Sequence, residues 1–193
     1  MKNLVILAVL VCAALLLAGC GIFGGNGGGN PTFTFKSLPT TLDEMKALPE
    51  ATLKDPYAVA ALTVVALTLY ETNQGECFKM LRFLKGPGDL SGLEQQQLQD
   101  RFRGGKYYKV WSFFDGATPE NSYTPSRPYR IEVSSNSYSF QEGGWATLYL
   151  KSGGADSPRV VKLRKKESTG QWFLNDIQFL GEIRTPASAD PWR

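Results

Sequence analysis

The pattern of hydrophobic and polar positions changes its period near the middle of the chain. Apolar residues first recur at helical spacing, and from Lys106 onward they mostly alternate with polar ones. A short helix is predicted over Asp43–Leu48, where Pro49 stops it. Asp55 can cap a second helix, Tyr57–Glu71. This segment is apolar nearly all round but shorter than the ~20 residues of a membrane span, so we expect it in the core.

Two further helices are predicted before the period changes. Asn73 can cap the first, whose apolar stripe contains Cys77, Met80, Leu81 and Leu84. Because the stripe faces the core, Cys77 is interpreted as a packing residue rather than a reactive thiol. The second helix fits Ser91–Arg103, and its side chains predicted to point inward are Leu93, Leu98 and Phe102.

Five segments of the second half have the pattern of strands: Tyr107–Phe114, Tyr129–Val133, Trp145–Lys151, Arg159–Lys166 and Gln171–Phe179. Short loops join the last three, which favours an antiparallel meander. Helices followed by strands predict an α+β fold, with N-terminal helices packed on a curved antiparallel sheet. This element order, with its late Gly-Gln-Trp-Phe-Leu strand, resembles the nuclear transport factor-like (cystatin-like) cone. That fold hosts enzymes, ligand binders and inert spacers, so it would not settle function.

The N-terminal residues have the pattern of a bacterial export signal. Lys2 precedes the uncharged apolar run Leu4–Ala18, which has the length of a signal-peptide core. The run ends in Leu17-Ala18-Gly19-Cys20, which resembles the bacterial lipobox. The resemblance implies cleavage before Cys20 and a diacylglycerol group on its sulfur; the alternative is an uncleaved signal anchor. We therefore expect a lipid-anchored protein on the extracytoplasmic face of a bacterial membrane.

This interpretation divides the chain into three parts. Residues 1–19 are the predicted signal peptide, and residues 20–35 are the lipidated cysteine and a tether. Glycine dominates the tether, as is typical of flexible linkers. Residues 36–193 are predicted to form a single α+β domain.

The amino-acid composition excludes several classes of function. The chain has no histidine, which removes Ser/His and Cys/His nucleophiles and His-ligated zinc. Its three cysteines are too few for a disulfide framework or a thiolate cluster. The formal net charge is +3, and loss of Lys2 lowers it to about +2, too little to indicate nucleic-acid binding. We expect no cofactor, no metal and no nucleic-acid partner.

Several short segments of the sequence resemble those of a known family. They are Asp55-Pro56-Tyr57 with the Ala-rich helix behind it, Phe83–Pro87, Phe114–Asn121, Ser152–Arg159 and the closing Asp190-Pro191-Trp192. Together they resemble a family of domains of unknown function found in lipoproteins of Firmicutes. The resemblance covers almost the whole domain after the tether. It implies an extracytoplasmic location and supplies no catalytic residue.

Two loops could carry a binding site. Asp115–Asn121 could form a carboxylate or calcium site, but Asp-Gly and Thr-Pro are also ordinary turn chemistry, which we favour. Ser152–Arg159 could form an anion-binding nest of backbone amides. The alternative, which we favour, is a wide hairpin loop in which Asp156 pairs with Arg159.

The fourth predicted strand is basic. Lys162, Arg164 and Lys166 share one face, between Arg159 at its start and the adjacent Lys165. This stripe could contact anionic lipid or wall polymer near the tether. A merely solvated sheet face is the favoured alternative.

No motif identifies a reaction, so the sequence favours a binding or structural interaction domain over an enzyme. Its predicted partners are the membrane, through the anchor, and an unknown envelope protein, polymer or small ligand. The alternative function is a small-substrate hydrolase or isomerase that uses Asp, Glu and Tyr in a cone-shaped pocket. Cys20, as the lipidation site, is the only site residue predicted, with no catalytic, cofactor-binding or metal-binding residue.

Overall fold

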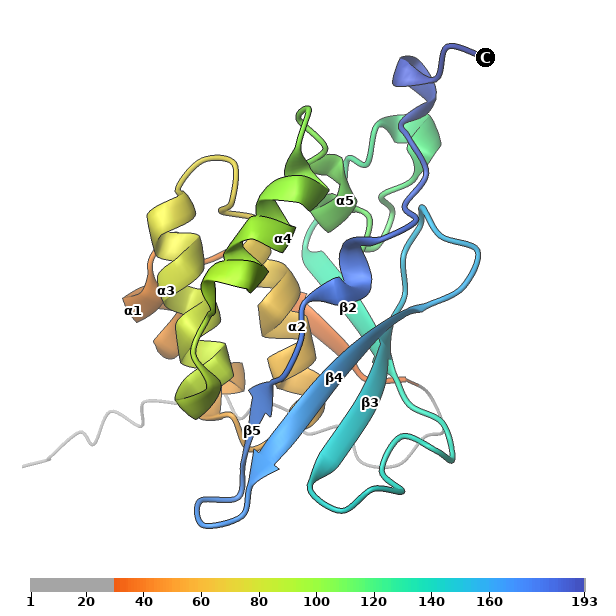
Figure 1. Ribbon diagram of the computed structural model, residues 1–193. Helices are drawn as coiled ribbons and strands as arrows, with labels where there is room; N and C mark the ends of the chain where they lie inside the picture. The colour runs from red at the N-terminus through yellow and green to blue at the C-terminus, as the bar shows by residue number, and fades with distance from the viewer. Residues whose placement is uncertain (1–29, 193) are drawn as a thin grey trace, which may run out of the picture.

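The computed structural model describes residues 30–192, and these form one five-stranded antiparallel sheet with helices packed on one side (Figure 1). The sheet follows chain order, β1-β2-β3-β4-β5, and curls into a half-barrel. The strands are β1 (Thr32–Phe35), β2 (Tyr129–Ser134), β3 (Trp145–Leu150), β4 (Arg159–Lys166) and β5 (Gln171–Leu174). The α-helices are α1 (Leu42–Lys46), α2 (Pro56–Leu67), α3 (Gln74–Lys85), α4 (Gly92–Phe102) and α5 (Tyr108–Trp111). Single 3-10 turns are η1 (Pro49–Thr52), η2 (Gly86–Gly88), η3 (Pro119–Asn121), η4 (Gln178–Leu180) and η5 (Ala187–Ala189). The predicted α+β class and meander are confirmed.

Helix α2 is the centre of the fold. Every residue from Ala58 to Leu67 is buried, because α3 packs on one side of the helix and the sheet on the other. The Asp55 carboxylate accepts a hydrogen bond from the Tyr57 amide at 2.8 Å, which confirms the predicted cap. The sheet contributes a set of fully buried aliphatic side chains: Ile131, Val133, Leu148, Leu150, Val161 and Leu163. The space between helices and sheet is thus filled by apolar packing.

The sheet begins earlier than the sequence predicts. Strand β1 lies within the range assigned to the tether, yet it pairs along its whole length with β2, with Thr32 opposite Glu132. The Pro31 carbonyl also accepts a hydrogen bond from the Val133 amide at 2.9 Å. The alternating Thr-Phe-Thr-Phe sequence is a strand pattern, but the glycine run before it obscures the signal. The tether prediction is therefore wrong at its C-terminal end.

The predicted strand over residues 107–114 is wrong. This segment forms α5 and the turns that follow it, in which the Ser112 amide donates to the Tyr108 carbonyl at 3.1 Å. Its aromatic rings join clusters with distant elements: Tyr107 stacks near Phe102 of α4, and Trp111 near Tyr129 of β2. Aromatic residues favour a strand only when their side chains can pack on a neighbouring sheet. Here the rings pack against helices and β2 instead, and the backbone of the segment is helical.

Two smaller predictions also fail. Leu93, predicted to face inward, is 66% exposed, whereas Leu98 and Phe102 of the same helix are buried as predicted. Strand β5 stops at Leu174 instead of Phe179, and the chain continues through Asn175 into η4. Among residues 30–192, no helix is long and apolar enough to cross a membrane.

Candidate functional site

A groove of about 540 Å³ lies at the β5 edge of the sheet, between the turn after α3 and the end of β4. Four cationic residues and one acidic residue line it: Lys85, Arg164, Lys165, Lys166 and Glu167. We call it the basic groove. Such an excess of positive charge favours an anionic ligand over a cationic or neutral one.

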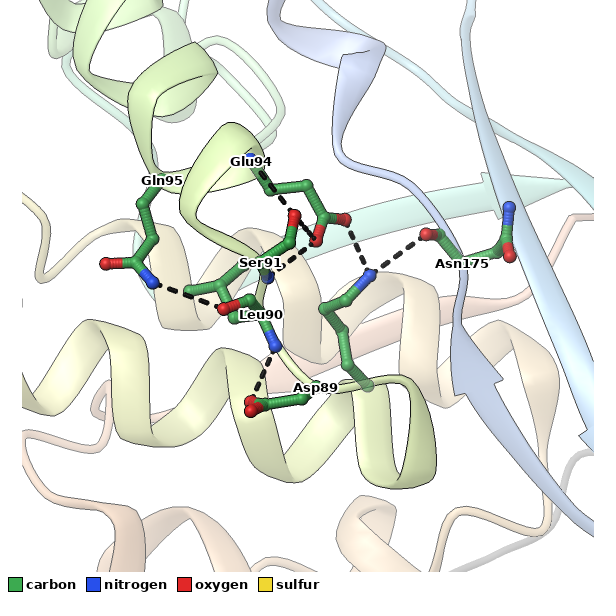
Figure 2. A network of polar contacts seen from close by, with 7 residues as sticks. Asp89, Leu90, Ser91, Glu94, Gln95 and Asn175 are labelled. Carbon is green, nitrogen blue, oxygen red and sulfur yellow. Dashed lines mark hydrogen bonds and ion pairs between the residues drawn. The ribbon is translucent and has the colours of Figure 1, made fainter.

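Lys85, which lines the basic groove, is held by contacts with two other elements, and its partners Glu94 and Asn175 are labelled in Figure 2. Its side chain is only 5% exposed, and its Nζ lies 2.6 Å from Glu94 Oε1 and 3.0 Å from the Asn175 carbonyl oxygen. Glu94 belongs to α4, and Asn175 follows β5 directly. The ammonium group therefore joins α3, α4 and the edge of the sheet, and its charge is compensated.

Glu94 is oriented by the N-terminus of its own helix. The Ser91 amide and hydroxyl both donate to Glu94 Oε2, at 3.0 and 2.8 Å, and the Glu94 amide donates back to Ser91 Oγ at 3.3 Å. This is a capping box. Partial burial acts to raise the pKa of Glu94, but hydrogen bonds from Lys85 and Ser91 outweigh it and hold the pKa below its ordinary value. Glu94 is thus an ionised partner for Lys85.

Gly86 permits the close approach that forms one wall of the groove. Its φ is +53°, and a Cβ atom there would lie 2.2 Å from the ring of Phe173. Only glycine combines this backbone conformation with contact to the ring. The turn after α3 therefore packs directly on β5.

The basic stripe lies as predicted on the face of β4 turned away from α2. Lys162, Arg164 and Lys166 are exposed, and none of them forms an ion pair within the described residues 30–192. The Arg164 guanidinium lies over the ring of Trp145, 5.2 Å from its centroid. Lys165 differs, because it pairs with Glu167 at 3.1 Å. Arg164 and Lys166 are thus the uncompensated cations of the basic groove.

The Ser152–Arg159 loop does not have the predicted pairing. Asp156 pairs with Arg184 and Arg159 pairs with Glu182, each at 3.3 Å, so the predicted Asp156–Arg159 pair is wrong. The C-terminal segment after η4 folds back over the loop and supplies both partners.

The two glycines of this loop allow it to pack closely against neighbouring segments. The Gly153 amide donates to the Ser112 carbonyl at 2.8 Å, and the Gly154 amide donates to Ser152 Oγ at 3.1 Å. A Cβ atom on Gly153 would lie 2.0 Å from the Ala117 carbonyl oxygen. Since both amides already have acceptors, they do not form the open nest that an anion needs.

Residues 115–121 form a turn, as favoured. The Asn121 side chain accepts from the Thr118 amide at 2.9 Å and donates to the Gly116 carbonyl at 2.7 Å. Asp115 pairs with Arg130 at 2.6 Å. Across the part of the chain that the structure describes, no group of three or more His, Cys, Asp or Glu residues is arranged to hold a metal ion.

A second groove, of about 460 Å³, lies beside β1 and β2 and is lined by two ion pairs. Asp115 pairs with Arg130 at 2.6 Å, and Glu132 with Lys151 at 3.1 Å. We call it the paired groove. A hydrogen bond from the Asn30 amide group, followed by that from Lys151, holds the pKa of Glu132 below its ordinary value. A catalytic acid at neutral pH needs the opposite shift.

Of the three cysteines, Cys77 lies within residues 30–192, which the structure describes. Cys77 is fully buried, and burial raises the pKa of its thiol to about 12. This agrees with a packing role, since the thiolate is the reactive form. Cys20, the predicted lipidation site, lies outside the described residues.

Comparison with known proteins adds one finding. The sequence model of a family described as a domain of unknown function, DUF6935, matches residues 37–187. The chain belongs to the DUF6935 family. No curated protein and no solved structure matches this DUF6935 chain, so its resemblance to a nuclear transport factor-like cone is not confirmed. The predicted resemblance to an uncharacterised domain family is confirmed, while the lipoprotein character stays a prediction.

Sequence reasoning missed the Lys85–Glu94 contact and therefore the basic groove. The local signal is the Ser91-x-x-Glu94 pattern, which predicts a capping box. That pattern gives no indication of Lys85, which reaches Glu94 only because η2 turns the chain back.

Proposed function

We propose that this DUF6935 protein is an extracytoplasmic lipoprotein, anchored by lipid on Cys20, whose domain binds a phosphate-bearing component of the cell envelope. The ligand is held at the basic groove and the adjoining face of β4. The protein acts by binding rather than by catalysis.

The anchor part of the proposal depends on the N-terminal sequence. A signal-type apolar run ends in Leu17-Ala18-Gly19-Cys20, where a small residue precedes the cysteine. Export and lipidation would place residues 30–192 outside the cytoplasmic membrane, among anionic lipids and polymers.

The binding part is supported by one observation, the row of uncompensated cations on β4. Lys162, Arg164 and Lys166 occupy alternate positions of one strand and are exposed. Like charges spaced about 7 Å apart repel one another, so an anion that neutralises them binds favourably. Arg164 and Lys166 also line the basic groove.

No observation favours the hydrolase or isomerase alternative. The carboxylates of the paired groove are engaged by Arg130 and Lys151. The helix side of the sheet is filled mainly by buried aliphatic residues, and no Asp or Glu within residues 30–192 is buried.

The binding test compares two double variants that remove equal charge. Lys162→Ala/Arg164→Ala removes uncompensated cations, and Arg130→Ala/Lys151→Ala removes paired ones from the same sheet. Long-chain inorganic polyphosphate is the probe, titrated over a salt series. We expect the first variant to lose roughly tenfold or more in affinity at low salt and the control to lose little, because only exposed, uncompensated charge attracts the probe.

The anchor test is independent of the binding test. Mass spectrometry of the membrane-extracted protein should find a diacylglycerol-modified Cys20 at the N-terminus, and Cys20→Ser should abolish the modification. An unmodified wild-type protein would refute the anchor, and equal affinities of the two double variants would refute the binding site.

A further inference from the structure

The β2–β3 loop, residues 135–144, presents two aromatic side chains to solvent. Tyr138 is 71% exposed and Phe140 is 45% exposed. Large aromatic side chains of a folded domain are mostly well buried, so two rings exposed to this extent two residues apart indicate an interaction surface. Tyrosine, whose ring has a polar edge, is favoured at the interface between water and a lipid bilayer, and phenylalanine can insert its apolar ring at the same boundary.

The loop is ordered by its own hydrogen bonds. Asn136 Oδ1 accepts from the Tyr138 amide at 2.8 Å, and buried Ser139 Oγ accepts from the Asn136 amide at 3.0 Å. The Phe140 ring packs beside Tyr57 and Trp172, with centroids 6.1 and 6.2 Å away. The loop backbone and the Phe140 ring are therefore held in a fixed arrangement, so that contact of the loop with a surface requires little further ordering.

The described chain begins next to this loop. Asn30 donates to Glu132 at 2.7 Å, and the Pro31 carbonyl accepts from the Val133 amide, two residues before the loop starts at Ser135. Pro31 is eleven residues beyond Cys20, so the two are at most about 40 Å apart even when fully extended. If Cys20 carries the lipid, as the proposed function holds, the loop is kept close to the bilayer.

Cationic residues flank the other end of the loop. The Gly144 carbonyl accepts from the Lys165 amide at 2.8 Å, and Trp145 lies opposite Arg164 in the ladder. The loop and the β4–β5 turn lie at the same lower end of the molecule in Figure 1, opposite the C-terminus. Two carboxylates, Glu142 and Glu167, share these segments, and Glu167 is neutralised by Lys165.

We propose that this end of the domain docks on the anionic membrane surface to which the lipid anchors it. Tyr138 and Phe140 enter the headgroup region, and Arg164 and Lys166 contact lipid phosphates. The phosphate-bearing ligand of the proposed function is thus the lipid headgroup. Aromatic insertion and cationic attraction act together, as in other interfacial attachments.

The experiment uses residues 20–193 with Cys20→Ser, which retains every helix and strand that the structure describes and has no lipid. Sedimentation with phosphatidylglycerol-containing vesicles is compared with sedimentation with pure phosphatidylcholine vesicles. Tyr138→Ser should weaken binding to the anionic vesicles roughly tenfold, because it removes a ring from the apolar interface. Its matched control is Trp192→Ser, which removes a 94% exposed ring at the far end and should change nothing.

A second pair of variants tests the cations. Arg164→Gln/Lys166→Gln should lose roughly fivefold per charge removed. Arg101→Gln/Lys106→Gln removes two exposed cations that have no ion pair within residues 30–192, near the end of α4, and as the matched control it should bind like the wild type.

The outcomes separate this inference from the proposed function. Binding to polyphosphate without preference for anionic vesicles would overturn membrane docking and leave the polymer-binding form of the proposed function. Equal effects of Tyr138→Ser and Trp192→Ser would also overturn it. Tyr138-dependent vesicle binding by a protein whose Cys20 carries no lipid in cells would support docking and refute the anchor.

Discussion

The two grooves at opposite edges of the sheet differ in how their charges are compensated. In the paired groove, Asp115 and Glu132 each have a cationic partner. In the basic groove the compensated charge is Lys85, while Arg164 and Lys166 have no anionic partner within residues 30–192. Compensated charges hold elements together, and uncompensated ones remain for a ligand. The comparison therefore separates the stabilising charges of this domain from those proposed to bind.

The largest effect is expected at Lys85. Lys85→Ala leaves the Glu94 carboxylate mostly buried without its cation, so the free energy of unfolding should fall by about 3 kcal/mol. Lys79→Ala is the matched control in the same helix, because Lys79 pairs with Glu76 but is 60% exposed, and its loss should cost no more than about 0.5 kcal/mol. Urea unfolding measures both. Equal losses would show that the buried pair is not a stabilising contact.

The second effect concerns pH. The pKa of Glu94 is lowered in the folded protein, so its contribution to stability is present above its unfolded pKa and lost as pH falls through its folded pKa. Stability should therefore decline below about pH 4.5, and Glu94→Gln should make that decline shallower. Thermal unfolding measured across this pH range checks it. An unchanged slope in Glu94→Gln would contradict the assignment.

The smallest effect is expected on the stability of the exposed β4 face. Lys162→Ala/Lys166→Ala should change the free energy of unfolding by less than about 0.5 kcal/mol, because both side chains are exposed and neither has an anionic partner within residues 30–192. Arg130→Ala/Lys151→Ala breaks two surface pairs and should cost about 1 kcal/mol in total. Chemical denaturation measures the free energy of unfolding of both double variants. A larger loss in the β4 variant would indicate that its cations stabilise the fold.

Local signals in the sequence predicted much of the fold. Asp55 and Asn73 cap their helices as predicted, because capping needs only a side chain and a nearby amide. Strand β4 has the predicted bounds Arg159–Lys166, since alternation is clear along it. These features depend on residues a few positions apart.

The features that sequence reasoning missed depend on distant residues. The aromatic segment 107–114 became helix and turns because rings from α4 and β2 receive its side chains. Arg159 forms its ion pair with Glu182 rather than with Asp156, because the C-terminal segment folds back over the loop. The basic groove required the Lys85–Glu94 contact, which periodicity does not encode. The predicted lipid site at Cys20 lies outside the described residues and stays a prediction.

Strand β1 has a mechanical consequence for an anchored protein. It is a four-residue edge strand that precedes the residues matched by the family, 37–187, and it is held by its ladder to β2. A force applied at Pro31 acts first on the hydrogen bonds between β1 and β2. It then acts on Phe35, whose side chain is only 3% exposed. Because β2 to β5 and the central helix do not lie between the pulling point and this ladder, β1 can yield under tension while the core stays folded. If Cys20 carries the proposed lipid, β1 is the first element of the described fold to unfold when the anchor is pulled.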